Sequence, residues 1–342
     1  MANAARVAVP VSELVGNEGL CPKSPVGGVR DRRTLRVALV NIVPDRAFED
    51  THRRFCDLIR ASSRDLDVEL RCYRLPDVCR SHPPALLRAS YQDVQCLYQD
   101  PPDALLVTGT EPVSAELTAE EFWSALEDLV RWAVTTVPST LMSCLAAHAT
   151  LRALDDVDRR SLPRKRNGVF SQAVDRSHVL GEGLSSMAAF PHSRWNEVPE
   201  PILRDHGYDV VMGTEGGEWT LAAREHAGRM LVLVQGHPEY EPTTLLREYR
   251  RDLRRYAEGS ASACPQVPVG YLDAAGEEQL RAWRASVGRV PPPDWRRHFS
   301  LDAMAPHVVP SWSHDAIQFF VNWIADARDR AIAGVGVRCE RG

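Results

Sequence analysis

A short apolar run that ends in a cysteine limits what this chain can fold into. Residues 138–143 read PSTLMS, and after Cys144 the chain continues with the small, helix-favouring residues LAAHA. This pattern predicts a buried strand that turns directly into a helix, with Cys144 at the turn. The thiol would then lie at the carboxyl end of a sheet, beside helix N–H groups that stabilise a thiolate. Because a lone cysteine is more often a buried structural residue, the case for catalysis depends on the rest of the chain.

The segments before this turn alternate between strand-like and helix-like patterns. Buried or alternating strands are predicted at 35–43, 68–75 and 104–110, with amphipathic helices at 48–62 and 119–134. Such alternation is typical of an α/β fold, with a mostly parallel, doubly wound sheet and helices on both faces. Sites in these sheets lie outside the carboxyl ends of the strands, where Cys144 is expected.

After the cysteine the pattern changes. A basic loop at 162–166 leads into a short strand, and further strands are predicted at 188–194, 208–212, 219–223 and 230–235. Short strands joined by glycine-containing turns indicate a twisted, partly antiparallel continuation of the sheet.

The chain divides into three predicted parts. Residues 1–33 are rich in Gly, Pro and Ala and are predicted to form a mobile arm. Residues 34–328 are predicted to form a single α/β domain, loop-rich at 259–328 apart from an apolar helix at 317–327. Residues 329–342 are predicted to be a loose tail.

Composition narrows the class of protein. The net charge is −5 and basic residues are interspersed with acidic ones, which argues against binding to nucleic acid or to a membrane surface. The eight cysteines form no C-x-x-C pair, and the histidines and carboxylates have no metal-ligand spacing, so neither a zinc site nor a disulfide framework is indicated. No apolar run is long enough to span a membrane. We therefore expect a cytoplasmic protein that acts on small molecules and holds no metal or bound cofactor.

A second reactive motif follows the strand predicted at 230–235. His237 stands at the strand end, and Glu239 follows two residues later across a proline. In an extended segment these two side chains project to the same side, so the carboxylate can orient the imidazole. A cysteine nucleophile needs such a base and such an orienting partner. A His-x-Glu at a strand end is by itself more often structural, but its order after a cysteine turn in an α/β pattern strengthens the case.

This order resembles the class I glutamine amidotransferase-like fold, a flavodoxin-like sheet with a nucleophile-elbow cysteine. Within it, local strings from about 35 to 327 resemble the homoserine O-acyltransferase family. They are NIVP at 41–44, VTG at 107–109, the cysteine turn, Lys165 ahead of GVF at 168–170, PHSR at 191–194, GHPEY at 236–240, RD at 251–252, and W-x-H at 312–314 through NW at 322–323. The resemblance implies acyl transfer from an acyl-CoA to the hydroxyl of an amino acid, and a homodimer.

The resemblance also implies roles for residues in the reaction. Cys144 would attack the CoA thioester and carry the acyl group in a ping-pong reaction, while the Leu145 N–H and a second N–H near 108–110 stabilise the oxyanion. His237, oriented by Glu239, would move the protons.

Substrate contacts follow from the same resemblance. Arg251 would bind the amino-acid carboxylate, and Glu248, on the same helical face, its ammonium group. Lys165 and Ser193 match the remaining substrate-binding positions. Arg46 stands where the family has lysine, and a cation there would face the acyl or phosphate end of CoA.

Acyl choice in the family depends on a position shortly after VTG, where Glu is typical of acetyl-specific and Gly of succinyl-specific members. Val113 falls there, with Glu111 two residues earlier. Because valine has no carboxylate to repel a succinyl group, we predict a succinyl-CoA:homoserine acyltransferase of methionine biosynthesis. Alternatives are an acetyl-CoA-dependent homoserine or serine acetyltransferase; the arm and an insert at 273–300 leave open a role in specialised metabolism. A glutamine amidotransferase-like hydrolase and a non-enzymatic binding protein are more distant.

Overall fold

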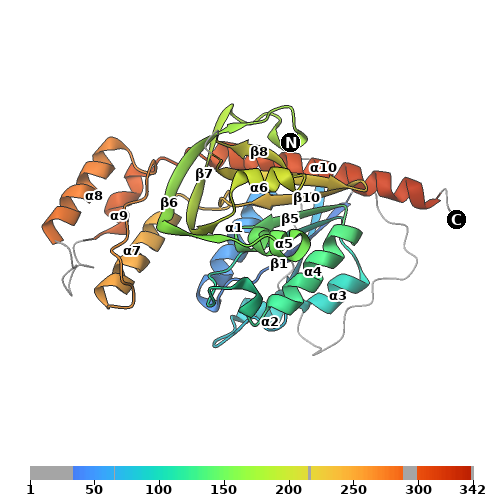
Figure 1. The fold of residues 1–342 in the computed structure, drawn as a ribbon, viewed down its shortest axis with the longest axis horizontal. Coiled ribbons are helices and arrows are strands. Elements are labelled where there is room, and N and C mark those ends of the chain that lie inside the picture. Colours follow the sequence, from blue (N-terminus) through green and yellow to red (C-terminus); the bar gives the residue numbers. More distant parts are fainter. Residues whose placement is uncertain (1–33, 65, 215–216, 288–298, 340–342) are drawn as a thin grey trace, which may run out of the picture.

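The computed structural model describes residues 34–64, 66–214, 217–287 and 299–339. The arm predicted at 1–33 lies outside these residues. The described strands form one ten-stranded sheet in the order β3-β2-β1-β4-β5-β10-β9-β8-β6-β7 (Figure 1). The strands are β1 (Thr34–Val40), β2 (Asp67–Arg74), β3 (Tyr91–Asp93), β4 (Ala104–Val107), β5 (Ser139–Ser143), β6 (Arg160–Val174), β7 (Met187–Glu197), β8 (Asp209–Gly213), β9 (Trp219–His226) and β10 (Arg229–Val234).

The sheet has a parallel part and an antiparallel part. All pairings from β3 to β10 along the sheet are parallel. From β10 onward, β9, β8, β6 and β7 pair antiparallel, with β6 and β7 forming a long ribbon at the edge. The predicted mostly parallel α/β sheet with an antiparallel continuation is therefore confirmed.

Helices cover both faces of the sheet. The main helices are α1 (Asp45–Ser62), α2 (Ala85–Ser90), α3 (Val94–Gln99), α4 (Trp123–Thr136), α5 (Leu145–Asp155), α6 (Glu200–Asp205), α7 (Thr244–Ala257), α8 (Ala274–Val287), α9 (Leu301–Met304) and α10 (Ser313–Cys339). Two apolar cores result: α1 and α10 pack in one, whereas α3, α4 and α5 pack in the other. None of the described helices is long and apolar enough to cross a membrane.

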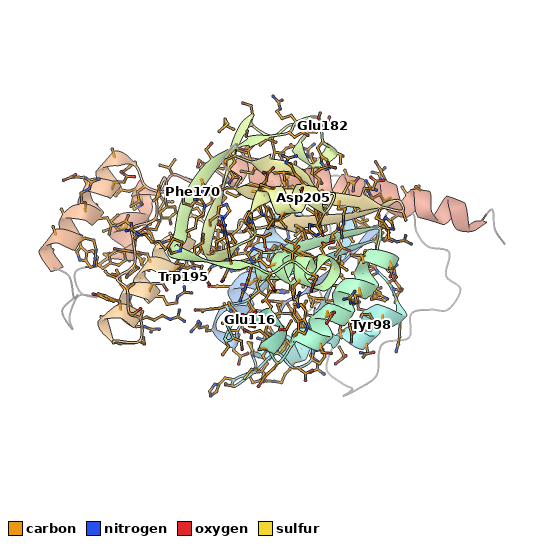
Figure 2. All side chains as sticks on the ribbon, viewed as in Figure 1. Tyr98, Glu116, Phe170, Glu182, Trp195 and Asp205 are labelled. Carbon is orange, nitrogen blue, oxygen red and sulfur yellow. The ribbon has the colours of Figure 1, made fainter. Side chains whose placement is uncertain are left out.

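The apolar side of each helix decides which face it covers. In α1, Phe48, Phe55 and Ile59 recur at helical spacing and are buried against the sheet. Figure 2 shows side chains filling the space between sheet and helices; on the opposite face, Tyr98 packs edge-on against Trp132 with ring centroids 4.9 Å apart. Burial of these aromatic rings contributes strongly to the stability of each layer.

Three predicted segments differ from the structure. The basic loop at 162–166 lies inside β6, which is hard to recognise because its register with β7 shifts between Ser161 and Arg166 and this stretch has no apolar alternation. The region at 259–328 is less loop-rich than predicted, since α8 occupies 274–287. The tail predicted from 329 continues α10 to Cys339, and Arg330 bonds Asp326 and Glu225, each at 2.8 Å.

Candidate active site

Cys144 occupies a sharp turn between β5 and α5. Its φ of 54° and ψ of −113° are strained for a residue with a side chain, a geometry that is typical of nucleophile elbows. The turn is fixed from the next strand, because the Cys144 N–H donates a 2.6 Å hydrogen bond to the carbonyl of Val234. The predicted strand, turn and helix are therefore present. The strain shows that the surrounding structure holds Cys144 in one orientation.

Two backbone segments meet at this turn. Leu145 opens α5, so its N–H has no acceptor within the helix. Gly109, which follows β4, packs against the turn so closely that an added Cβ would lie 2.9 Å from both the Cys144 Cβ and the Leu145 nitrogen. Glycine is required here because no side chain fits. The backbones of the two segments thus meet beside Cys144, with the Leu145 nitrogen at the contact.

His237 and Glu239 follow the end of β10 and lie beside Cys144. The His237 Nδ1 is 2.8 Å from the Glu239 Oε1, and the imidazole makes a side-chain interaction with Cys144. The ring stacks on Tyr240 with centroids 4.3 Å apart, and the His237 N–H donates to the Pro191 carbonyl at 2.8 Å. These contacts fix the imidazole between the thiol and the carboxylate.

Charge on His237 is favoured by the same neighbours. Burial opposes a positive charge there, but the Glu239 carboxylate and Cys144 outweigh this effect and raise the pKa of the imidazole well above its usual value. A protonated His237 therefore faces Cys144, which is the environment in which reactive cysteines are found.

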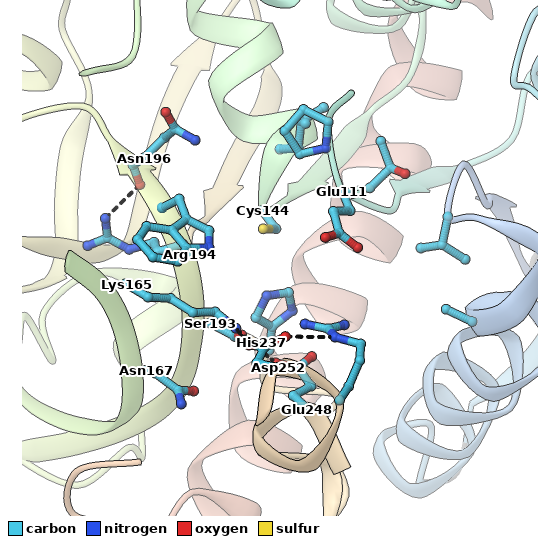
Figure 3. Close-up of a pocket in the computed structure, with 18 of the residues that line it drawn as sticks. Glu111, Cys144, Lys165, Asn167, Ser193, Arg194, Asn196, His237, Glu248 and Asp252 are labelled. Carbon is cyan, nitrogen blue, oxygen red and sulfur yellow. Dashed lines mark hydrogen bonds and ion pairs between the residues drawn. The ribbon is translucent and has the colours of Figure 1, made fainter. Parts of the chain in front are cut away.

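A cavity of about 900 Å³ opens above these residues. In Figure 3 the Cys144 thiol points into it above the His237 ring, with Glu111 on one side and Arg194 on the other. The cavity walls come from both parts of the sheet and from α7. Its volume is typical of pockets that hold a small organic substrate.

The predicted acceptor-binding residues meet in one network below His237 (Figure 3). The Ser193 hydroxyl donates to Glu248, and the Tyr240 hydroxyl donates to the same carboxylate at 2.7 Å. Asp252 lies one helical turn after Glu248 on α7, and Lys165 of β6 contacts it at 2.6 Å.

Arg251 belongs to the same cluster. Its Nε also bonds Asp252, at 2.9 Å, and the carboxylates of Glu248 and Asp252 favour its positive charge. Asp252 and Tyr240 belong to the RD and GHPEY motifs, but the sequence analysis predicted no role for either. Their position next to predicted site residues in these motifs could have indicated one.

The two candidates for acyl choice lie in different surroundings. Glu111 lines the cavity and bridges Arg46 and Arg255, with a 2.7 Å bond to the latter. Val113 is 94% exposed and does not line the cavity, because Glu120 accepts its N–H at 2.8 Å and holds the segment outward. The structure therefore brings Arg46 and Glu111 to the site, but not Val113.

Other cavity residues were missed by the sequence analysis. Arg159, Arg194, Arg255 and Asn167 all line the cavity. Arg194 belongs to the PHSR motif and to a predicted strand but received no role. Arg159, Arg255 and Asn167 lie in charged or polar stretches where no local pattern distinguished them. Within the described residues, no group of His, Cys, Asp and Glu is arranged to hold a metal ion.

An α/β sheet that presents a strained cysteine to a His–Glu pair defines a class: proteins built for acyl transfer through a cysteine. A family model described as homoserine O-succinyltransferase matches residues 9–329. This chain therefore belongs to the homoserine O-succinyltransferase family, whose members are acyltransferases.

Individual relatives agree with the family assignment. The chain is 37% identical to a homoserine O-succinyltransferase of Methylorubrum extorquens, over 95% of this chain and 96% of the relative. It is 38% identical to the Rhodopseudomonas palustris enzyme of that name, over 81% of each chain. Among solved structures, a Trypanosoma brucei CTPS glutaminase domain with bound acivicin matches with a TM-score of 0.45 and 14% identity, over 69% of this chain and 98% of that one. No functional conclusion follows from similarity at that level.

Proposed function

We propose that this protein transfers a succinyl group from succinyl-CoA to the hydroxyl of L-homoserine, a step of methionine biosynthesis. The observation that supports this most is Cys144 at a strained turn, facing the His237–Glu239 pair, in a chain of the homoserine O-succinyltransferase family.

The first half-reaction would load Cys144. The sulfur attacks the thioester carbonyl of succinyl-CoA, a new carbon–sulfur bond forms, and the bond to the CoA sulfur breaks. The Leu145 N–H and an N–H near Gly109 lie where they would stabilise the oxyanion. His237 gives a proton to the departing CoA thiolate, which leaves as a neutral thiol.

The second half-reaction would transfer the succinyl group from Cys144 to the homoserine hydroxyl. His237, now neutral and held by Glu239, takes the proton from the homoserine hydroxyl as its oxygen attacks the thioester. The ester forms and the thiolate of Cys144 is regenerated. Fixing the imidazole at Nδ1 leaves Nε2 free for both proton transfers, which is why the carboxylate contact matters.

The acceptor would be held by the network below His237. The Arg251 guanidinium suits the amino-acid carboxylate, and Glu248, with Ser193 beside it, suits the ammonium group. Lys165 would add a cation on the same wall.

The donor would be attracted by charge. The described cavity is lined by eight cationic side chains and four acidic ones, which favours an anionic donor such as a CoA ester. Arg46 is assigned to the CoA side, because its side chain lines the cavity, is largely exposed to solvent and, within the described residues, is paired with Glu111. We propose a succinyl rather than an acetyl donor because the excess of cationic side chains also favours an acyl group that carries a carboxylate. The cationic residues are Arg46, Arg54, Arg159, Arg164, Lys165, Arg194, Arg251 and Arg255, and the acidic ones are Glu111, Glu239, Glu248 and Asp252.

Intact-mass analysis would test the proposal directly. Mixing the protein with succinyl-CoA is expected to add one succinyl group at Cys144, and L-homoserine is expected to remove it while O-succinylhomoserine appears. Acetyl-CoA and L-serine are the competing donor and acceptor. Loading by acetyl-CoA alone, or unloading by serine alone, would contradict the assigned substrates. Ammonia release from glutamine without any acyl adduct would contradict the acyl-transfer mechanism.

We further propose a homodimer that works in the cytoplasm, as the family resemblance implies. Sedimentation equilibrium at assay concentrations is expected to give twice the chain mass, and a single-chain mass would contradict it.

A further inference from the structure

We propose that Arg159 binds the distal carboxylate of the succinyl group carried by Cys144, and thereby selects succinyl-CoA over donors with uncharged acyl groups. This inference rests on the proposed function. Arg159 is the residue just before β6, and it lines the same cavity as Cys144 and His148.

The side chain of Arg159 is poorly satisfied within the protein. Among the described residues, its guanidinium donates one hydrogen bond, from Nη2 to the carbonyl of Ala115 at 3.3 Å. Its Nε is buried and has no partner among the described residues. A buried donor without an acceptor is costly, and in native proteins such a group commonly awaits water, an ion or a ligand.

Its charge also lacks a close counter-ion. Six other cationic side chains of the cavity have a carboxylate oxygen within 4.0 Å: Arg46 and Arg255 on Glu111, Lys165 and Arg251 on Asp252, Arg54 on Glu241, and Arg194 on Glu197. In the described part of the chain, neither Arg159 nor Arg164 has one. Arg164 is exposed to solvent, whereas Arg159 is half-buried. A substrate carboxylate would therefore gain most at Arg159.

Arg159 faces the cavity into which an acyl group on Cys144 would extend, and both residues line that cavity. Burial lowers the pKa of the Arg159 guanidinium, whereas the charges of Glu120, Cys144 and Glu116 oppose this effect. A succinyl group on the Cys144 sulfur ends in a carboxylate, whereas an acetyl or butyryl group ends in a methyl. The guanidinium fork can hold that carboxylate with two hydrogen bonds.

The neighbouring segment at 110–116 is held in place by two residues. Glu120 accepts the N–H groups of Val113 and Ser114, at 2.8 and 2.6 Å, and Arg159 holds the carbonyl of Ala115. The segment that the family resemblance connects with acyl choice thus contacts Arg159 directly. This contact explains how acyl choice operates here although the Val113 side chain points away from the cavity.

Arg159→Gln tests the inference in a donor comparison. Acylation of Cys144 is followed by intact mass and by release of the CoA thiol, with succinyl-CoA and with butyryl-CoA, which has the same carbon number without the carboxylate. We expect kcat/KM for succinyl-CoA to fall roughly 10- to 100-fold, the size of a lost charge-assisted hydrogen bond, while the value for butyryl-CoA changes little. Arg159→Lys is expected to recover part of the succinyl preference. Arg164→Gln is the matched control: it removes an exposed cation from the same cavity, so it should affect both CoA esters equally and leave the ratio of their kcat/KM values unchanged.

Each result has a defined meaning. An equal loss with both donors would assign Arg159 a structural role through Ala115 and overturn the inference, as would an unchanged preference for succinyl-CoA. Acylation by butyryl-CoA also shows that the variant is folded; if Arg159→Gln fails to fold, the comparison of Arg159→Lys with wild type decides. If wild-type protein forms no acyl adduct with succinyl-CoA, the proposed function fails first and the Arg159 assignment fails with it.

Discussion

The two parts of the sheet contribute different things to one cavity. In the proposed function the parallel part supplies the chemistry, because Cys144 follows β5 and His237 follows β10, and these two strands are neighbours. The antiparallel ribbon and α7 supply Lys165, Ser193 and Arg251, which hold the substrate in the proposed function. Parallel strands all end at one edge, so reactive groups at their ends meet without any special contact. The ribbon reaches the same place only by its length and twist.

This difference suggests that the two parts tolerate change differently. In the parallel part a reacting group is fixed by backbone geometry, as at the strained Cys144. In the ribbon and α7 the side chains are fixed by one another, through Glu248 and Asp252. Variants of the first kind are expected to stop the reaction, and variants of the second kind to change which substrates are used. Four predictions test this contrast.

The largest effect is expected from Cys144→Ala. Without the sulfur no acyl-enzyme forms, and acyl transfer should fall by at least ~10³, as observed when a nucleophile is removed from a catalytic unit. Steady-state release of CoA measures this loss. Cys264→Ala is the matched control, because Cys264 also lines the cavity but is bonded to Arg284. A similar loss in both variants would contradict a specific role for Cys144.

Arg251→Gln is expected to separate the two half-reactions. Loading of Cys144 by succinyl-CoA should be nearly unchanged, while kcat/KM for homoserine should fall about 100-fold as one charge-assisted carboxylate contact is lost. Rapid mixing followed by mass analysis measures the rate at which Cys144 is loaded. Formation of the ester product measures kcat/KM for homoserine. Arg254→Gln, on the same helix but paired with Glu258, is the control. Slower loading in Arg251→Gln would place Arg251 on the donor side instead.

Gly109→Ala tests the close contact beside the nucleophile. A Cβ there would lie 2.9 Å from the Cys144 Cβ and from the Leu145 nitrogen, so the turn must shift. We expect overpacking to lower the free energy of unfolding by about 1–3 kcal/mol. If part of that strain falls on the reacting groups, kcat should decrease by about tenfold or more. Gly334→Ala, on α10 with open space around it, should leave kcat unchanged and is the control. Normal activity in Gly109→Ala would show that the contact can relax.

The smallest effect concerns pH and His148, which lies in α5 one turn after Cys144. Burial lowers the pKa of His148 to about 3, while its Nε2 bonds the Gln235 side chain at 3.0 Å. In the unfolded chain His148 binds a proton as the pH falls below about 6.5, whereas in the folded protein it stays neutral down to about pH 3. The free energy of unfolding therefore decreases as the pH drops from 6.5 toward 3. Near pH 5.5 this difference in proton binding lowers the free energy of unfolding by about 1 kcal/mol.

His148→Gln should remove that contribution. Urea unfolding at pH 7.5 and 5.5 is expected to show a smaller acid-induced loss in the variant than in wild type. His226→Gln, at an exposed position, controls for removal of a histidine. An identical pH dependence in wild type and His148→Gln would contradict the assigned cause.

Local pattern predicted the parallel part of the molecule well. The run before Cys144 forms β5 and the residues after it form α5, because an apolar strand followed by small helix formers has few other low-energy arrangements. The ribbon was predicted less well. Much of β6 reads as a basic loop, since its pairing with β7 is interrupted between Ser161 and Arg166 and this stretch shows no apolar alternation. The 274–287 helix was missed for a related reason, as its apolar pattern is weak.

The sequence by itself determined the fold class, and it predicted Cys144 as the nucleophile and the His237–Glu239 pair as its partner. Those features are local, since strand ends and i, i+2 spacing are fixed by backbone geometry. Only the tertiary structure decided which side chains complete the cavity. It turned Val113 outward, joined Lys165 to Asp252 across 87 residues of chain, and left Arg159 half-buried without a carboxylate partner in the described part. Such contacts depend on how distant segments pack, and no short-range pattern in the sequence encodes them.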